Sequence, residues 1–167
     1  YDSDSGRIFI ATADSLITYS VTTDIVSRVK TNKGAPFRCG GGSALLYDKE
    51  RNCLISYSTQ FPDLNIYNFQ TQSWSGSGTE ILPPIQQHNH FIDYKNHKLV
   101  LFGGYGMHQY KANLIVRDLF DGAWKTTDLK TQIMPRYLSA AGLYEDSILM
   151  VMGGYGSPSG KQEELPQ

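Results

Sequence analysis

The sequence predicts an all-β protein made of short antiparallel strands. Apolar runs of four to seven residues recur along the chain, and Gly, Asp, Asn, Ser or Pro bounds each run. The 11 Tyr, 7 Phe and 16 Gly among 167 residues are typical of strands joined by tight turns. No stretch carries apolar residues at the i, i+3, i+4, i+7 spacing of a sustained amphipathic helix.

Charge and hydropathy exclude several classes of protein. With 15 Lys and Arg against 16 Asp and Glu, the net charge of -1 lacks the basic footprint of a nucleic-acid binder. A charged fraction of 19% and an aromatic fraction of 12% exclude a disordered chain. The longest apolar runs, such as Ile148–Met152, have about five residues, so we expect no membrane span. Because the sequence starts at Tyr1 without Met or a signal-peptide pattern, we interpret it as a mature or excised piece.

The predicted strands are the apolar runs that lie between turn residues. They are Arg7–Ala11, Ser15–Val21, Cys53–Tyr57, Leu64–Phe69, Lys98–Phe102, Asn113–Leu119 and Ile148–Met152. Short strands at regular spacing, with turn signals between them, favour an all-β architecture.

The chain repeats itself with a period of about 50 residues. A Tyr followed by a polar turn and an apolar strand occurs at Tyr1, Tyr47, Tyr94 and Tyr144, at spacings of 46, 47 and 50 residues. Each of these tyrosines therefore marks the same point in one repeat.

Two further markers agree with this period. The segment Leu101–Gly106 returns as Val151–Gly156, 50 residues later, and Trp74 and Trp124 are also 50 residues apart. The residues that we assign to the structural repeat are Tyr47, Tyr94, Tyr144, Gly103, Gly104, Gly153, Gly154, Trp74 and Trp124.

Each repeat is predicted to contain four strands, a to d. In the repeat with the clearest pattern, these are about His90–Tyr94, Lys98–Gly103, Asn113–Leu119 and Ala123–Leu129. Two adjacent glycines at the end of strand b allow a sharp turn and the close approach of neighbouring backbone. The Trp of strand d is predicted to pack against the next repeat, because a sheet this small must bury both of its faces against neighbours.

This pattern resembles the kelch repeat. The residues that carry the resemblance are Leu99–Gly104, Val116–Asp118, Trp124, Pro135–Arg136, Ala141–Tyr144 and Leu149–Gly154. The first two repeats depart from it, since Ile10–Ala13 and Ile55–Ser58 stand where the glycine pair is expected. The resemblance implies kelch-type β-propeller blades of four-stranded antiparallel sheets, as in the central domain of galactose oxidase. It also implies that strand a lines a central channel and strand d lies at the rim.

The repeats divide the chain at about residues 1–35, 36–84, 85–133 and 134–167. At roughly 48 residues each, they amount to about three and a half blades, whereas propellers typically have four or more. We therefore expect an incomplete ring, a fragment of a larger propeller. Such a piece exposes unpaired strand edges and an apolar blade face, so we expect it to self-associate or to pack against the missing blades.

The long loops on one side of the blades are the predicted binding surface. In an up-and-down sheet the b–c and d–a loops share one side, and here these loops are longer than the a–b turns. Long loops on a rigid scaffold commonly carry binding residues. The candidate ligand-binding residues are Arg38, His88, His90, Tyr105, His108, Tyr110, Arg136 and Tyr155.

Two arginines stand out within this set. Arg38 and Arg136 fall just before strand a of their repeats, which places them near the channel entrance. A guanidinium group there suits a carboxylate or a sulfate, and the resemblance adds that some kelch propellers bind acidic peptides through arginines at this place. The alternative interpretation is that these arginines bind neighbouring loop carbonyls.

We expect no metal site and no cofactor. His88 and His90 lie on one side of a strand and could begin a metal site, but no nearby Cys, Asp or Glu completes a tetrahedral set by spacing. The segment Asp2–Gly6 begins like a calcium loop, but its twelfth position is Ala13 where such a loop needs Glu. We interpret this segment as an a–b turn.

Cys39 and Cys53 are predicted to be free, mostly buried thiols. In the predicted hairpin they lie about eight positions out of register, which far exceeds the reach of a disulfide. An unbridged pair is compatible with any compartment, so the localisation stays open.

The sequence favours a non-catalytic binding module that recognises a peptide or protein segment on the long-loop face. Tyr105, Tyr110 and Tyr155 would stack on the ligand, and the arginines would bind anionic groups. We find no catalytic motif, and the copper ligands of galactose oxidase have no match here. Two alternatives stay open. One is a carbohydrate-related propeller, either a glycan-binding domain or part of a sugar-acting enzyme, and the other is a structural segment without a ligand.

Overall fold

A computed structural model describes residues 1–36, 40–60, 64–77, 84–119, 122, 124–145 and 147–162. Every regular element in these ranges is a strand, and two of the sheets have four antiparallel strands, so the predicted all-β fold class is confirmed. Among the same residues there is no helix that is long and apolar enough to cross a membrane. The chain forms two compact units, Tyr1–Ile81 and Leu82–Gln167, which we describe separately.

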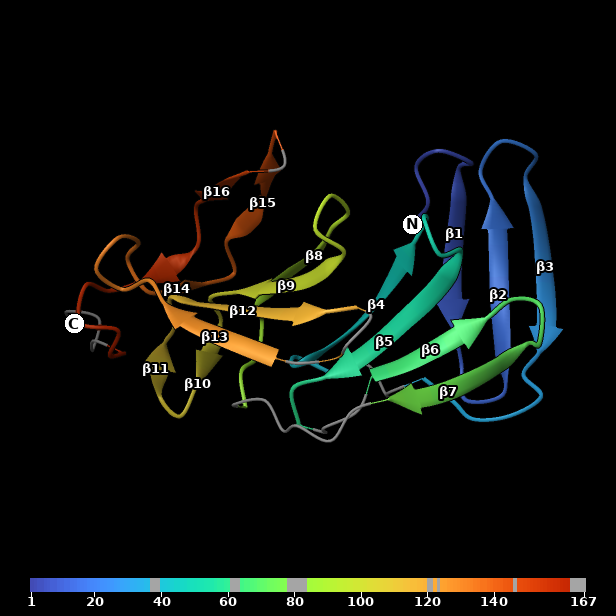
Figure 1. Ribbon diagram of the computed structural model, residues 1–167, viewed down its shortest axis with the longest axis horizontal. Coiled ribbons are helices and arrows are strands. Elements are labelled where there is room, and N and C mark those ends of the chain that lie inside the picture. The colour runs from blue at the N-terminus through green and yellow to red at the C-terminus, as the bar shows by residue number, and fades with distance from the viewer. Residues whose placement is uncertain are drawn as a thin grey trace, which may run out of the picture. The chain divides into compact units, whose positions relative to one another are not determined.

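The first unit contains two antiparallel sheets (Figure 1). Its strands are β1 (Arg7–Ala11), β2 (Ser15–Ser20), β3 (Ile25–Lys30), β4 (Ser43–Asp48), β5 (Cys53–Ser58), β6 (Leu64–Asn68) and β7 (Ser73–Ser77). The sheet orders are β1-β2-β3 and β4-β5-β6-β7, so each strand pairs with its neighbour in sequence. This is the up-and-down connectivity that the short polar turns predict.

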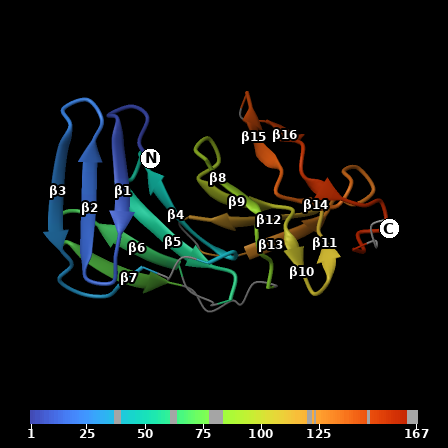
Figure 2. The ribbon, with the colours of Figure 1, turned by 180° about the vertical axis from the view of Figure 1, so that it is seen from behind.

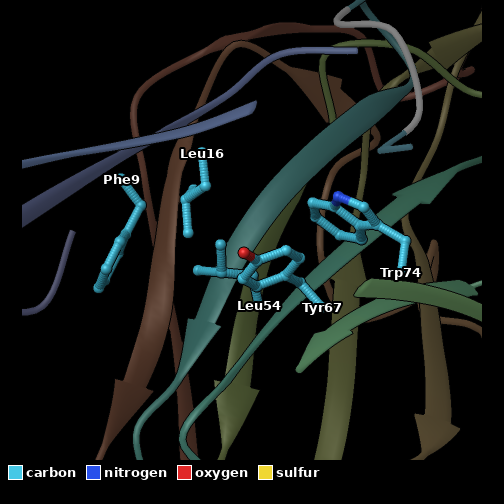
Figure 3. Close-up of a cluster of buried hydrophobic side chains, with 5 residues drawn as sticks. All are labelled: Phe9, Leu16, Leu54, Tyr67 and Trp74. Atoms are coloured by element: carbon cyan, nitrogen blue, oxygen red, sulfur yellow. The ribbon is translucent and has the colours of Figure 1, made fainter. Parts of the chain in front are cut away.

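Apolar side chains from both sheets form the core of the first unit. Figure 3 shows Phe9 and Leu16 from the first sheet, with Leu54, Tyr67 and Trp74 from the second. All five are buried, and the Tyr67 and Trp74 rings are 5.1 Å apart. Burying side chains of this size contributes about 1.5–3 kcal/mol each, so the cluster joins the two sheets firmly.

Trp74 packs in the opposite direction to the predicted one. We expected it to pack against the following repeat, but it belongs to the cluster that the second sheet shares with the preceding sheet. Its backbone N–H donates to the Lys33 carbonyl at 2.8 Å, and a Cβ on Gly34 would lie 2.8 Å from the Trp74 Cβ. The reason is that the linker leaving the first sheet runs beside β7 and forms a parallel bridge from Lys33 to Ser73.

The two other sequence features of this unit concern Asp2 and the cysteines. Asp2 and Arg7 form a backbone bridge, and the Arg7 guanidinium donates to the Asp2 carboxylate at 2.9 Å. These contacts close the turn that the sequence predicts at Asp2–Gly6.

Cys53 is a buried free thiol, as predicted, and burial raises its pKa. Cys39 lies outside the described residues.

The second unit contains a four-stranded sheet and a two-stranded hairpin. The sheet order is β13-β12-β9-β8, and β15 pairs with β16. The strand bounds are β8 (Asn89–Asp93), β9 (Lys98–Phe102), β12 (Asn113–Asp118), β13 (Trp124–Asp128), β15 (Ala140–Tyr144) and β16 (Ile148–Met152). The four strands of the larger sheet match the predicted strands a to d within one residue at every end.

Four very short strands lie beyond the ends of these sheets. They are β10 (Tyr105–Gly106), β11 (Gln109–Tyr110), β14 (Arg136–Tyr137) and β17 (Tyr155–Gly156). β10 and β11 form a small hairpin (Figure 2) between β9 and β12, where the sequence predicts a long b–c loop. Met107 and His108 turn this hairpin with φ of 52° and 57°, the left-handed pair of a primed two-residue turn. The prediction missed the turn because it contains neither Gly nor Asn.

Candidate functional site

The a–b hairpins of the second unit continue past their glycine pairs. Gln86 pairs with Tyr105 in the same register as β8 and β9. In the same way β14 pairs with β17 in the register of β15 and β16, which sets Tyr137 opposite Tyr155. Each hairpin therefore presents a tyrosine just beyond its glycine pair.

Glycine is required where these strands approach one another. Gly104 and Gly154 have φ of 100° and 85°, which side chains rarely adopt. A Cβ on Gly104 would lie 2.8 Å from the Gln86 carbonyl oxygen, and one on Gly154 would lie 2.6 Å from the Tyr137 carbonyl oxygen. The glycine pairs thus bring the extended hairpins close enough for their tyrosines to meet.

Backbone hydrogen bonds tie the two hairpins together. The Gly104 N–H donates to the Arg136 carbonyl at 2.9 Å, and the Arg136 N–H donates to the Lys111 carbonyl at 3.0 Å. The Tyr110 N–H also donates to the Gly160 carbonyl at 2.7 Å. These bonds fix β10, β11, β14 and β17 relative to one another, so the side chains that they carry form a defined surface.

Four tyrosines gather on this surface. Tyr105, Tyr110, Tyr137 and Tyr155, which we call the tyrosine cluster, come from β10, β11, β14 and β17 in turn. The Tyr137 ring is central, with ring centroids 5.7 Å from Tyr105, 5.4 Å from Tyr110 and 6.0 Å from Tyr155. The Tyr110 and Tyr137 rings are stacked, with 9° between their planes. Tyr155 is 69% exposed and the other three are half-buried, so the rings are accessible to a ligand.

The hydroxyl groups of the tyrosine cluster are largely available. Tyr105 donates to the Gln162 side-chain oxygen at 2.8 Å. In the part of the chain that the structure describes, the hydroxyls of Tyr110, Tyr137 and Tyr155 have no hydrogen-bond partner. Three phenol groups can therefore donate to a bound molecule without breaking an existing bond.

Tyr137 was missing from the predicted site. The other three tyrosines were candidates because they lie in the long loops, whereas Tyr137 follows Arg136 at the start of the last a–b hairpin. Continuing the pairing of that hairpin past Gly153 and Gly154 would have set Tyr137 opposite Tyr155.

A pocket of about 210 Å³ adjoins the tyrosine cluster. It is lined by Pro84, Gln86, Tyr105, Gly106, Met107 and His108. The candidate residue His108 therefore lies at the edge of this pocket, outside the ring contacts. Met107 is 79% exposed and gives the pocket an apolar rim.

Arg136 binds backbone carbonyls. Its Nε–H donates to the Met134 carbonyl at 3.1 Å, and its Nη1–H donates to the Gly153 carbonyl at 2.9 Å. These bonds are the ones that the alternative interpretation of this arginine expects. Because successive residues of a strand point to opposite sides, Arg136 lies on the other side of β14 from Tyr137. Arg38, the other candidate arginine, lies outside the described residues.

The two candidate histidines form a separate pair. The His88 and His90 rings are 6.0 Å apart at the start of β8, where His88 is buried and His90 is exposed. Burial, and next the positive charge that His90 can carry, lower the pKa of His88 to about 4, so His88 is neutral at pH 7. Within the described ranges, no three His, Cys, Asp or Glu side chains are grouped so that they could hold a metal ion.

Comparison with known proteins identifies the architecture. No family model matches the chain, and no curated protein matches it. Among solved structures, the structure of YjhT superposes with a TM-score of 0.60 at 14% sequence identity. YjhT is a kelch-like β-propeller. The fold is β-propeller-like.

This likeness concerns the fold alone. It covers 89% of this chain and 54% of the YjhT chain, so the present chain spans about half the length of that structure.

Proposed function

We propose that this chain is built of kelch-type blades and acts as a non-catalytic binding module for a peptide or protein segment. The blades would correspond to residues of about 1–35, 36–84, 85–133 and 134–167, and each sheet in the described residues falls within one of these ranges. The tyrosine cluster is the observation that carries the proposal. It gathers four accessible rings on a surface held by backbone hydrogen bonds.

The chemistry of the tyrosine cluster suits a peptide. Tyrosine offers a large, rigid contact area at low cost in conformational entropy, and its hydroxyl can donate to a main-chain carbonyl. The cluster is preorganised, since each ring already packs against at least one other. Preorganised rings lose little freedom on binding, which favours affinity.

Arg136 can contribute at the edge of this site. Two of its guanidinium nitrogens bind carbonyls, while Nη2 makes no hydrogen bond to the described residues. That group could bind an acidic side chain of a ligand that reaches this side of β14.

The alternative is a carbohydrate ligand. Aromatic rings also stack on sugars, and the amides of Gln86 and Gln162 flank Tyr105 as donors and acceptors for hydroxyl groups. A glycan-binding domain or part of a sugar-acting enzyme would use the same surface.

The test is selection of ligands against the whole chain. An unbiased displayed peptide library and a glycan array are screened with the wild-type protein, with Tyr137→Ala and with Tyr144→Ala. Tyr144 is 53% exposed and makes none of the ring contacts of the cluster, so it is the matched control. We expect selected peptides that bind wild type and Tyr144→Ala but lose binding to Tyr137→Ala. Peptides that bind all three proteins equally, or no peptides at all, would reject the proposal, and Tyr137-dependent glycans would favour the alternative.

We also propose that β16 packs against a further blade or a second copy of the chain. Ile148, Met150 and Met152 are 52%, 49% and 68% exposed, whereas Leu99, Val100, Leu101 and Phe102 of the corresponding strand β9 are at most 6% exposed. Exposed apolar residues on one strand commonly mark an interaction surface. Sedimentation analysis over a range of concentrations tests self-association, and a monomer throughout would rule out the second copy.

A further inference from the structure

We infer that the tyrosine cluster recognises a proline-rich segment in the polyproline II conformation. This inference rests on the proposed function, because it names the class of peptide that the same site would bind. Three observations lead to it, namely the available hydroxyl donors, the lack of carboxylates among the described residues around the cluster and the arrangement of the rings.

The polar groups of the tyrosine cluster are matched to a ligand that accepts hydrogen bonds. The hydroxyls of Tyr110, Tyr137 and Tyr155, which have no partner among the described residues, can each donate one hydrogen bond. A polyproline II helix has no internal hydrogen bonds, so all its carbonyls are available as acceptors. Proline has no N–H of its own, so it brings no donor that the surface would have to satisfy.

The surroundings of the cluster disfavour ligands rich in donors. The four described segments that form it, residues 84–92, 103–113, 134–142 and 153–162, contain no Asp or Glu, while Glu163 and Glu164 lie outside the described residues. A sugar ring or an ordinary peptide brings O–H or N–H groups that must find acceptors, and the acceptors on this surface are the phenol oxygens and the side-chain oxygens of Gln86 and Gln162. A proline-rich segment needs fewer acceptors and leaves the hydroxyls free to donate.

The cations near the cluster lie on its other side. Tyr105 and Tyr110 are cross-strand partners on one face of the β10–β11 hairpin, and Gln109 lies on the opposite face. The Lys111 ammonium group donates to the Gln109 side chain at 3.0 Å, so it belongs to that opposite face as well. Among the described residues the ring face is thus uncharged, which suits an uncharged ligand.

The ring geometry is that of an aromatic-lined surface. Proline-rich segments dock on such surfaces because the rigid polyproline II helix loses little entropy and its rings pack flat against aromatic side chains. Tyr105 and Tyr155 both contact the Tyr137 ring, at 5.7 and 6.0 Å. The pocket beside Tyr105, with Pro84 and Met107 in its lining, extends the apolar surface for further residues.

The experiment compares uncharged peptides of equal length with the whole chain. The probes are a capped oligoproline of about ten residues, an oligosarcosine and an alternating Gly-Ser peptide. Oligosarcosine lacks N–H groups but has neither the proline ring nor the rigid helix. It therefore separates the contribution of the rigid helix to binding from the contribution of the missing N–H donors. Binding is measured by calorimetry and by the amide chemical shifts of Tyr105, Tyr110 and Tyr137. The proteins are wild type, Tyr137→Ala, Tyr137→Phe, Tyr155→Ala and the control Tyr144→Ala.

We expect oligoproline to bind at least about tenfold more tightly than the Gly-Ser peptide, with oligosarcosine between them. Tyr137→Ala should weaken oligoproline binding by about tenfold or more, and Tyr137→Phe by about threefold through the lost hydroxyl, while Tyr144→Ala should leave it unchanged. If Tyr137→Ala fails to fold, Tyr155→Ala decides, because the exposed Tyr155 ring contributes little to packing.

The outcomes separate the two proposals. Equal binding of oligoproline and the Gly-Ser peptide, or oligoproline binding that no cluster variant changes, overturns this inference. If library-selected peptides without proline enrichment still depend on Tyr137, the proposed function stands while the polyproline ligand is rejected. If neither oligoproline nor any selected peptide binds, both proposals fail, and Tyr137-dependent glycans would replace both.

Discussion

The close approach at Gly104 predicts a graded series of Gly→Ala effects on the stability of the second unit. Three glycines of this unit differ in what a methyl group would meet. Gly142 has no left-handed φ and open space around its Cβ position, and Gly153 has φ of 67° and open space. Gly104 combines φ of 100° with a Cβ position 2.8 Å from the Gln86 carbonyl oxygen. The series therefore separates backbone strain from steric contact.

The expected magnitudes follow from these differences. Gly142→Ala should leave the free energy of unfolding unchanged or raise it by up to about 1 kcal/mol, because Ala restricts the unfolded chain. Gly153→Ala should lower it by about 1 kcal/mol, the cost of a left-handed backbone for Ala. Gly104→Ala adds the displacement of Gln86 from Tyr105, whose two backbone hydrogen bonds are 2.8 and 2.9 Å long. With about 1 kcal/mol for each bond, we expect a loss of about 3–4 kcal/mol.

The assay is urea unfolding followed by tryptophan fluorescence. The chain has two tryptophans, Trp74 in the first unit and Trp124 in the second. A Trp74→Phe background makes Trp124 the sole reporter, so the transition belongs to the second unit. If Gly104→Ala destabilises no more than Gly153→Ala, the steric argument for the glycine pair is refuted.

Three further predictions concern buried groups. Trp74→Ala should lower the free energy of unfolding of the first unit by about 3–5 kcal/mol, because the Trp74 side chain is 4% exposed within the shared cluster. Urea unfolding followed by circular dichroism measures this loss. A loss below about 1 kcal/mol would contradict the packing. Because the folded pKa of His88 is about 4, the unfolded chain takes up a proton near pH 6.5 that the folded chain does not. Stability should therefore fall by about 2 kcal/mol from about pH 8 to about pH 5 relative to His88→Gln, and identical pH profiles would refute this. In a Cys39→Ser background, the buried Cys53 thiol should react with a thiol reagent only after unfolding, and rapid reaction of the folded protein would show that it is accessible.

Most of the strand arrangement could be predicted because it depends on local patterns. The apolar run Lys98–Phe102 is flanked by turn residues on one side and by a glycine pair on the other, and the strand has these bounds. The 50-residue period aligned Gly103 and Gly104 with Gly153 and Gly154, and all four adopt positive φ. Such features need only the neighbouring residues to be specified, since turn geometry and side-chain alternation act over a few positions.

The short hairpin at β10 and β11 was less accessible to sequence reasoning. Met107 and His108 occupy left-handed positions that side chains of their type rarely adopt. Backbone bonds from Tyr110 to Gly160, and from Lys111 to Gly104, hold the segment in this shape. The turn is thus imposed by tertiary contacts, one of which joins Tyr110 to a residue 50 positions away. The residues next to the turn in sequence carry no signal of such a contact.

By itself, the sequence determined the fold class, the strands and the repeat, and it identified three of the four clustered tyrosines. Only the tertiary structure decided that these rings meet, that Tyr137 lies at their centre, that Arg136 binds carbonyls and that Trp74 packs toward the preceding sheet. The physical reason is that periodicity and turn propensity are properties of adjacent residues. Ring contacts and packing directions depend instead on how strands from different repeats approach one another, and here glycine pairs and inter-hairpin hydrogen bonds set that approach.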